Sequence, residues 1–437
     1  DTVVDAIFEQ SGVIRVKSVD ELFDLAKSFD RTILPAGNRV GILTNAGGPA
    51  ILTVDEAQNS GLQVPELSQA SQKKLKKFLV PEAAFLNPVD VLPNATAEVY
   101  GKATKIMLAD KNIDAGIIIL GPPLMYDTLE IGIAICNAAM KSGKCSAIVL
   151  MSQDDIIPKL AVSVPGHPPI FNNCEAAEKA IGQMYNYKLY KEKATGNYHA
   201  YASNKIIVRN ILKKYKGDVY IAFDDVVKIL EAYKFPVIES FLAKNVHESI
   251  QVAEGLGFPV VIKVSGKKLV HKSDIGGVIV DIKSVEELVI AENRVIASLK
   301  EKSLDKELDG FIIQPFVKGG IETILGVIKD DKAGHLVAFG MGGILVEVLK
   351  DVKFKLAPLS DMDADELMKS VNGYKILNGI RGKQPVDLDF VRENLLKLSQ
   401  LVQDFPEITE IDFNPFVFSP ERKKCKILDA RIKVSLK

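Results

Sequence analysis

The sequence predicts an α/β protein in which a doubly wound parallel sheet domain is followed by a domain of α+β type. From residue 38 to about 190, short apolar runs alternate with amphipathic stretches, as in parallel strands joined by helices. After residue 205, a helix, two strands and short terminal strands indicate an α+β arrangement. Because 437 residues exceed what one hydrophobic core usually supports, at least two cores are expected.

Four apolar runs are expected to form the buried strands of the parallel sheet. They are Val40–Thr44, Ala115–Leu120, Ser146–Met151 and Pro169–Asn172. A capped helix over Val16–Ala26 belongs to a segment, residues 1–37, that we expect to be the tail of a preceding domain. The polar composition of residues 187–205 predicts a linker or a mobile loop.

The second domain has its own set of expected elements. They are a helix over Asp224–Tyr233, strands over Phe258–Val264 and Gly310–Gln314, and short strands near Ile411 and Ile427.

The composition excludes several classes of protein. Lys and Arg number 55 against 56 Asp and Glu, so the chain lacks the basic excess that nucleic-acid binding usually needs. No apolar run approaches the roughly 20 residues that cross a bilayer, so we expect a cytoplasmic protein. The four cysteines lie far apart without a CxxC pair, which predicts reduced core thiols; they are Cys136, Cys145, Cys174 and Cys425.

A first candidate phosphate site follows the strand Val40–Thr44. Gly47 and Gly48 open the next helix, and bare backbone N–H groups at the positive end of a helix dipole can hold a phosphate. The alternative is a tight βα turn that uses glycine for its geometry. The segment is neither a Walker A loop nor a GxGxxG fingerprint. Asn87–Asp90 is a candidate second loop at the same sheet edge, or a plain proline turn.

A second candidate phosphate site surrounds a histidine. Lys263 ends an apolar strand and aims a cation at the sheet edge, and Gly276 and Gly277 allow close backbone approach to a ligand. Between them, His271 is a candidate phosphoryl acceptor, with Asp274 as the group that holds its other ring nitrogen. The alternative is a surface loop in which the histidine is merely solvated.

A candidate nucleotide segment follows the strand Gly310–Gln314. Backbone groups of Gln314, Pro315, Phe316 and Val317 are placed to bond an adenine, and the carboxylate of Glu322 is placed to accept ribose hydroxyls.

Oxygen ligands suited to Mg²⁺ lie near the end of the chain. Asn414 and Asp429 belong to the segments Glu410–Pro415 and Ile427–Arg431, and Mg²⁺ usually takes one or two protein side chains together with phosphates and water. A third glycine-rich turn, Gly340–Gly343, predicts either a lid or a structural hairpin.

These motifs, in this order, resemble those of the ADP-forming acyl-CoA synthetases, relatives of succinyl-CoA synthetase. The carriers of the resemblance are the His271–Val278 segment, Gly340–Glu347 and the Asp412–Pro415 turn. The resemblance implies a tail of a succinyl-CoA-ligase-like domain at 1–37 and a flavodoxin-like domain at 38–190. It further implies a linker at 191–205 and an ATP-grasp domain of two subdomains at 206–437.

The resemblance also implies roles. Lys263 would contact the phosphates of ATP or ADP, Gln314–Val317 the adenine, Glu322 the ribose, and Asn414 with Asp429 the Mg²⁺ ion. His271 would carry phosphate, and the helix at Gly47 and Gly48 would face the phosphohistidine.

The implied reaction converts a carboxylic acid, coenzyme A and ATP into acyl-CoA, ADP and phosphate, within an oligomer. The acid is acetate, or a hydroxy acid such as 3-hydroxypropionate or 4-hydroxybutyrate. Because the chain opens on Asp1, and because the family's CoA-binding domain and first active-site histidine would precede a segment like residues 1–15, we expect an N-terminal portion or subunit to supply both.

Two rival functions stay open at this point. One is an ATP-grasp ligase that forms an amide, or carboxylates its substrate, without a phosphohistidine. The other is a non-catalytic nucleotide-binding subunit.

Overall fold

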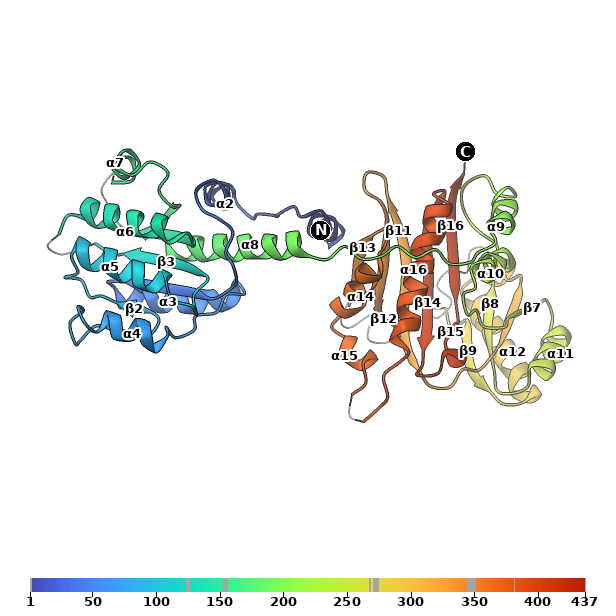
Figure 1. Cartoon of the computed structure of the whole chain (residues 1–437). Coiled ribbons are helices and arrows are strands. Elements are labelled where there is room, and N and C mark those ends of the chain that lie inside the picture. The colour runs from blue at the N-terminus through green and yellow to red at the C-terminus, as the bar shows by residue number, and fades with distance from the viewer. Residues whose placement is uncertain are drawn as a thin grey trace. The chain divides into compact units, whose positions relative to one another are not determined.

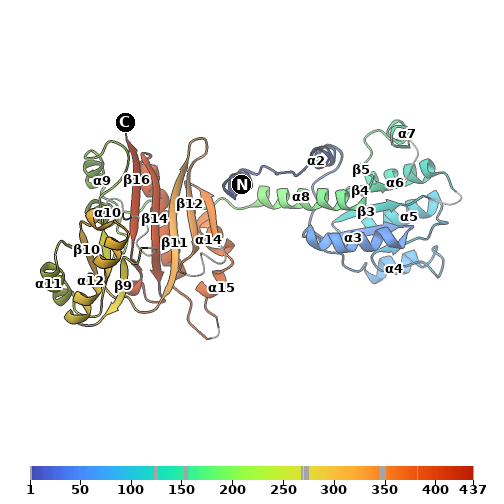
Figure 2. The ribbon, with the colours of Figure 1, turned by 180° about the vertical axis from the view of Figure 1, so that it is seen from behind.

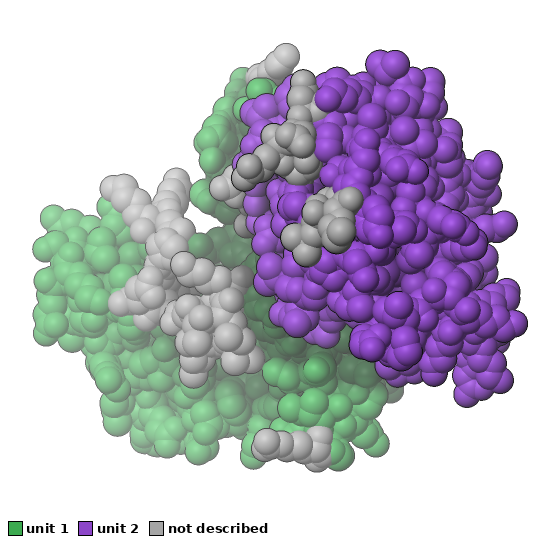
Figure 3. Space-filling view, turned by 90° about the vertical axis from the view of Figure 1, so that its left-hand side faces the viewer, with its two compact units in different colours: residues 1–10, 195–437 green, residues 11–194 purple. Residues whose placement is uncertain are grey.

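The computed structural model divides the chain into two compact units, each with its own core. One unit comprises residues 11–194, and the other comprises residues 1–10 and 195–437 (Figure 3). The structure describes residues 2–122, 126–151, 156–266, 269, 275–343, 351–380 and 382–436. Within these ranges, no helix combines the length and apolar character needed to cross a bilayer.

The unit of residues 11–194 is built on a five-stranded parallel sheet with the order β2-β1-β3-β4-β5. Its strands are β1 (Val40–Thr44), β2 (Val89–Asp90), β3 (Ala115–Leu120), β4 (Cys145–Leu150) and β5 (Ile170–Phe171). Its helices are α2 (Val19–Arg31), α3 (Gly47–Asn59), α4 (Gln69–Leu75), α5 (Ala97–Leu108), α6 (Thr128–Ser142), α7 (Ile156–Ser163) and α8 (Cys174–Glu192). This strand order is that of flavodoxin-like folds, so the predicted fold class is confirmed for this unit.

Helices cover both faces of this sheet (Figure 1). One core joins strand residues to α4, α5, α6 and α7, and the other joins them to α2, α3 and α8. The central strands β1, β3 and β4 are buried along their whole length, which explains their uninterrupted apolar sequences.

The other unit contains two antiparallel sheets. A four-stranded sheet has the order β7-β10-β8-β9, and a second sheet has the order β13-β12-β11-β14-β16-β6, with β15 paired to β14. The strands are β6 (Gly217–Tyr220), β7 (Phe241–Ala243), β8 (Val260–Ser265), β9 (Val278–Ile282), β10 (Gly310–Pro315), β11 (Ile321–Asp330), β12 (Gly334–Met341), β13 (Val352–Leu356), β14 (Ile408–Phe418), β15 (Lys426–Ile427) and β16 (Ala430–Leu436). Figure 2 shows the two sheets from behind.

The helices of this unit cover one face of each sheet. They are α1 (Thr2–Ser11), α9 (Lys205–Leu212), α10 (Phe223–Ala232), α11 (Val246–Leu256), α12 (Val285–Glu301), α14 (Asp361–Ser370), α15 (Tyr374–Leu377) and α16 (Leu388–Asp404), with short 3₁₀ turns η1 (Asp305–Glu307) and η2 (Arg422–Lys424). α11 and α12 share a core with the four-stranded sheet, whereas α9, α10, α14 and α16 share one with the larger sheet. This mixture confirms the predicted α+β class.

Three predictions of local structure were wrong. The helix predicted over Val16–Ala26 is α2, Val19–Arg31, and it begins at Val19 because the Ser18 side chain caps it by accepting from the backbone N–H of Glu21. Residues 187–192 are helical, since α8 continues to Glu192 and carries a Lys188–Glu192 ion pair one turn apart. The strand through Ile411 is β14, which is 11 residues long.

The segment after α8 is bonded to the second unit by side chains. The Gln400 amide accepts from the backbone N–H of Tyr201 at 2.7 Å and donates to its carbonyl at 3.0 Å. Asp361 accepts from the backbone N–H of Asn197 at 2.7 Å and donates its own N–H to the Asn197 carbonyl at 3.0 Å. Two residues of the predicted linker, Asn197 and Tyr201, are thus hydrogen-bonded through their backbones to α14 and α16.

Candidate functional site

The first glycine motif lies at the carboxyl edge of the parallel sheet. β1 lies between β2 and β3, so the chain turns in opposite directions on its two sides, and ligands of such folds bind at this point. Gly47 and Gly48 form the first turn of α3, and a side chain at Gly48 would meet nothing within 4 Å. The N-cap residue is Ala46, whose side chain cannot accept a hydrogen bond, so the open N–H groups that the sequence predicts are available.

Two asparagines fix the loops around this turn. Asn45 accepts from the Gly121 N–H at 2.8 Å and donates to the Gly121 carbonyl at 3.1 Å, which joins the loops that follow β1 and β3. Asn87 accepts from the Ile42 N–H at 2.9 Å and donates to the Val40 carbonyl at 2.9 Å. Asp90 pairs in register with Thr44, so the Asn87–Asp90 segment does reach the same edge.

In the unit of residues 1–10 and 195–437, Lys263 and Gln314 lie on the same face of the four-stranded sheet. The register pairs Lys263 with Ile312 on β10 and Gln314 with Val261 on β8. The alternate residues Ile262 and Ile313 belong to the core with α11 and α12, so Lys263 and Gln314 occupy the opposite face. Both side chains are nevertheless buried, at 7% and 3% exposure.

These two side chains converge on one backbone carbonyl. The Lys263 ammonium donates to the Leu428 carbonyl at 2.8 Å, and the Gln314 amide donates to the same oxygen at 3.1 Å. Leu428 immediately precedes Asp429, and the backbone N–H of Asn414 donates to the Asp429 carbonyl at 3.2 Å. The predicted phosphate lysine and the two predicted metal ligands therefore belong to one hydrogen-bonded cluster.

The predicted metal ligand Asn414 lies on the face of the larger sheet that points away from its hydrophobic core. Ile411 and Phe413 of β14 are in the core, so the alternating Asp412 and Asn414 point away from it. Burial raises the pKa of Asp412, and Asp429 raises it further. Among the described residues, no three His, Cys, Asp or Glu side chains are arranged to hold a metal ion. Two oxygen ligands fit Mg²⁺, because nucleotide phosphates and water complete its coordination.

The segment between β8 and β9 contains the predicted phosphoryl acceptor, and only part of it is described. His271 and Asp274 lie outside the described residues. Gly276 has a φ of +70°, which favours glycine, and the Val264 N–H donates to the Gly277 carbonyl at 2.8 Å. In the sequence, His271 thus falls between β8, which ends two residues after Lys263, and β9.

The segment predicted to contact adenine follows directly from β10. The N–H of Phe316 donates to the Pro259 carbonyl at 2.9 Å, and Pro315 and Val317 are half-buried beside it. Further on, the predicted ribose ligand Glu322 is exposed at the start of β11.

The third glycine motif packs against Glu322. The N–H of Gly342 donates to the Glu322 carbonyl at 2.8 Å, and a side chain at Gly342 would lie 2.8 Å from the backbone of Glu322. The described part of this turn thus has a structural role beside the candidate ribose site.

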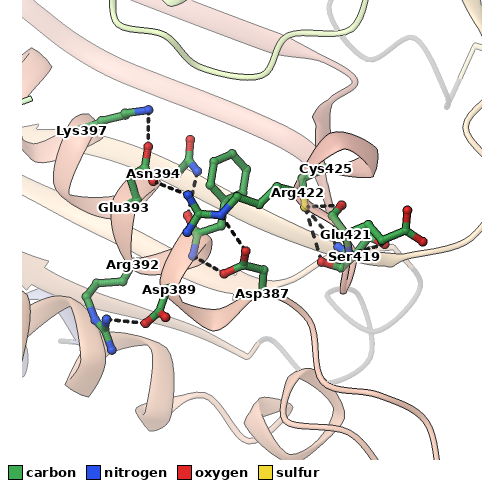
Figure 4. Close-up of polar contacts among 11 residues, drawn as sticks. Asp387, Asp389, Arg392, Glu393, Asn394, Lys397, Ser419, Glu421, Arg422 and Cys425 are labelled. Carbon is green, nitrogen blue, oxygen red and sulfur yellow. Dashed lines mark hydrogen bonds and ion pairs between the residues drawn. The ribbon is translucent and has the colours of Figure 1, made fainter. Parts of the chain in front are cut away.

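A charged cavity of about 520 Å³, separate from the cluster around Leu428, lies on the side of the larger sheet that α14 and α16 cover. Its two arginines are already paired with carboxylates (Figure 4): Arg392 with Asp389 at 2.7 Å, and Arg422 with Asp387 at 2.7 Å. Since these donors are occupied, the cavity is a network of ion pairs and does not compete with the cluster around Leu428 as a nucleotide site.

Comparison with known proteins agrees with this geometry. Residues 214–434 match the model of the ATP-grasp domain, and residues 40–157 match that of the Ligase-CoA domain. The chain is 37% identical over 225 residues to a β subunit of an ADP-forming acetate–CoA ligase from Pyrococcus furiosus, of which it covers 96%. The chain belongs to the family of ADP-forming acyl-CoA synthetases.

Two longer members of the family match almost the whole chain. The 4-hydroxybutyrate–CoA ligase (ADP-forming) of Nitrosopumilus maritimus is 33% identical over 99% of this chain and 62% of its own length. The acetate–CoA ligase (ADP-forming) I of Archaeoglobus fulgidus is 34% identical over 94% of this chain and 59% of its own length. The chain thus spans about three fifths of these two relatives.

Sequence reasoning missed two members of the hydrogen-bonded cluster around the Leu428 carbonyl. Ser240 accepts a hydrogen bond from the Gln314 amide at 2.8 Å, and Leu428 contributes only its carbonyl. No side-chain motif marks either residue, whereas the Asp429 that follows Leu428 was found by its ligand chemistry.

Proposed function

We propose that this chain is the ATP-binding and phosphohistidine-relay part of an ADP-forming acyl-CoA synthetase. The observation that carries the proposal is the convergence of Lys263 and Gln314 on the segment that bears Asp429, next to Asn414. A buried lysine, an adjoining strand-end segment and two oxygen ligands are the groups that a Mg²⁺-bound nucleotide requires.

In the proposed relay, an imidazole nitrogen of His271 attacks the γ-phosphorus of ATP. The bond to the β-γ bridging oxygen breaks, and ADP leaves with that oxygen. Lys263 would stabilise the charge on the phosphates, and Asn414 with Asp429 would hold the Mg²⁺, which supplies further charge neutralisation when bound. His271 would then pass the phosphoryl group to the first active-site histidine, which we expect in the N-terminal portion. That histidine would transfer it to the carboxylate of the acid, and the thiol of coenzyme A would displace phosphate from the acyl phosphate.

The parallel-sheet unit would serve the acyl side of this relay. The open N–H groups at Gly47 and Gly48 fit a phosphoryl group, because the helix dipole of α3 favours a negative charge there. The acid is proposed to be acetate or 4-hydroxybutyrate, the substrates named for the two longer relatives.

Coenzyme A is proposed to bind mainly to an N-terminal portion or a partner subunit. One face of α2 supports such a partner, since Val19, Leu22 and Phe23 are 66%, 52% and 66% exposed at helical spacing. We propose that this portion covers that face and that residues 1–37 are its continuation.

One labelling experiment tests the relay. Incubation with γ-³²P-ATP and Mg²⁺ should give label that is acid-labile and base-stable, and His271→Asn should abolish it. The matched control is His247→Asn, which changes an exposed histidine on α11 that contacts Gln251 and should keep the label. Protein that binds ADP but never becomes labelled would exclude the relay and favour an ATP-grasp ligase without phosphohistidine.

A binding experiment tests the nucleotide site separately. Lys263→Met should weaken ADP binding, measured by calorimetry, by at least about tenfold, since a charge-assisted contact to phosphate contributes about 1.5–3 kcal/mol. Lys397→Met is the control, because Lys397 is equally buried and donates to the Lys234 carbonyl at 3.0 Å, within the α16 network. Equal losses in the two variants would contradict the assignment of Lys263.

A further inference from the structure

Gln314 occupies the centre of a hydrogen-bonded chain that crosses between the two sheets. Its amide nitrogen donates to the Ser240 hydroxyl at 2.8 Å and to the Leu428 carbonyl at 3.1 Å. The Ser240 hydroxyl in turn donates to the Ile238 carbonyl at 2.9 Å. Both hydrogens of the amide are therefore committed, and the side chain is 3% exposed.

This series of hydrogen bonds leads to the turn that carries Asp429. On the side of the larger sheet, the Leu428 N–H donates to the Pro415 carbonyl at 3.0 Å, and the Asn414 N–H donates to the Asp429 carbonyl at 3.2 Å. On the side of the smaller sheet, Gln314 and Lys263 hold the Leu428 carbonyl. These two donors thus tie the carbonyl that immediately precedes Asp429 to the smaller sheet.

The two donors differ in what a nucleotide would do to them. Lys263 is a flexible cation, so a bound phosphate competes with the Leu428 carbonyl for its ammonium group. Gln314 is neutral, and both hydrogens of its amide are already donated, so a phosphate does not compete for it with the Leu428 carbonyl. Gln314 is therefore the donor that persists when Lys263 turns to a ligand.

We infer that Gln314 is a positioning residue, which holds the Leu428–Asp429 turn so that Asn414 and Asp429 present their oxygens to the metal of a Mg²⁺-bound nucleotide. The inference rests on the proposed function and gives the Gln314 side chain a role distinct from the adenine contact proposed for the backbone of its segment. Groups that orient metal ligands in this way typically change metal affinity by about 10- to 100-fold when they are removed.

Binding of Mn²⁺ with ADP, in which electron paramagnetic resonance counts the bound Mn²⁺, tests the inference. Gln314→Met keeps the length of the side chain and removes both donors. We expect this variant to need at least about tenfold more Mn²⁺ for half-saturation in the presence of ADP. Its affinity for ADP without metal should change less than about threefold, because Lys263 and the backbone segment remain. Gln314→Leu, which is also neutral and lacks both donors, is the second variant and should behave alike.

The matched control is Gln400→Met, which removes a half-buried amide. That amide is hydrogen-bonded to the backbone of Tyr201 in the same unit. It should leave both affinities as in the wild type. Equal weakening of metal-free and metal-dependent binding in Gln314→Met, or no weakening of either, would overturn the positioning role while leaving the nucleotide site in place. A wild-type chain that binds neither ADP nor Mn²⁺ with ADP would refute the proposed function, and the inference would fall with it.

Discussion

Glu178 on α8 is a carboxyl group that is buried without hydrogen bonds to offset the loss of its hydration. It is 0% exposed, and neither carboxylate oxygen has a hydrogen-bond partner in the described part of the chain. Burial, together with smaller contributions from the nearby carboxylates of Glu56 and Glu175, raises its pKa from the ordinary 4.5 to about 9. The folded protein therefore holds a neutral Glu178 at pH 7.

This shift makes the stability of the parallel-sheet unit depend on pH. Below 4.5 both the folded and the unfolded state carry the proton, so burial of the carboxyl group has its lowest cost. As the pH rises from 4.5 towards about 9, only the unfolded state ionises, and the free energy of unfolding falls by about 1.4 kcal/mol per pH unit. From about pH 5.5 to about pH 8 the wild type should lose about 3 kcal/mol through this group.

Glu178→Gln removes the titrating group and keeps its shape. The difference in free energy of unfolding between this variant and the wild type should therefore shift by about 3 kcal/mol in favour of the variant from about pH 5.5 to about pH 8. Pulse proteolysis in urea, with fragments of residues 11–194 identified by mass spectrometry, measures this unit by itself. The control is Glu130→Gln on α6, an exposed position where no such shift is expected. Parallel pH profiles for wild type and Glu178→Gln would refute the reasoning.

Two further substitutions test the same unit. Arg39 holds Asp114 through two side-chain hydrogen bonds of 2.7 and 2.8 Å, and these bonds lower the pKa of Asp114. Arg39→Ala should thus cost about 1–2 kcal/mol in urea unfolding at neutral pH. The cost should shrink as the pH falls below 3.8 and disappear once the pH is below the lowered pKa of Asp114 in the folded state; an unchanged cost in acid would contradict the ion pair. Gly48→Asp should stabilise α3 by about 0.3–1 kcal/mol yet reduce acid- and CoA-dependent ADP release by about a hundredfold in an assembly with the N-terminal portion, because a carboxylate repels the phosphoryl group. Retained activity in that variant would remove α3 from the relay.

The sequence was sufficient where one physical cause dominates. β1 and β3 were predicted to the residue, because buried parallel strands appear as unbroken apolar runs that end at a turn. The length of β14 was underestimated because the face that points away from the core carries Glu410, Asp412 and Asn414. Their polarity and the proline that follows Asn414 suggest a turn. The alternation of these polar residues with Ile411 and Phe413 indicates a strand only when it is known that Ile411 and Phe413 belong to the core.

The candidate site shows the same division. Lys263, Asn414 and Asp429 were predicted as ligand-binding residues from side-chain chemistry, which a sequence displays directly, and the structure joins their segments by hydrogen bonds. Ser240 and Leu428 were not, since they are 74 and 114 residues from Gln314 and act through a hydroxyl and a backbone oxygen. Convergence over such separations is a property of the sheet register, and no local pattern encodes it.

The four cysteines of this chain give experimental access to the histidine loop. Cys136, Cys145, Cys174 and Cys425 are all buried, and burial raises the pKa of each thiol, in Cys136 and Cys145 to about 12. Reagents that require a thiolate should pass over them at neutral pH. A single cysteine placed on the surface would then accept a spectroscopic label without prior removal of the native thiols. Since the chain has no tryptophan, a single introduced indole would likewise report on its own surroundings alone.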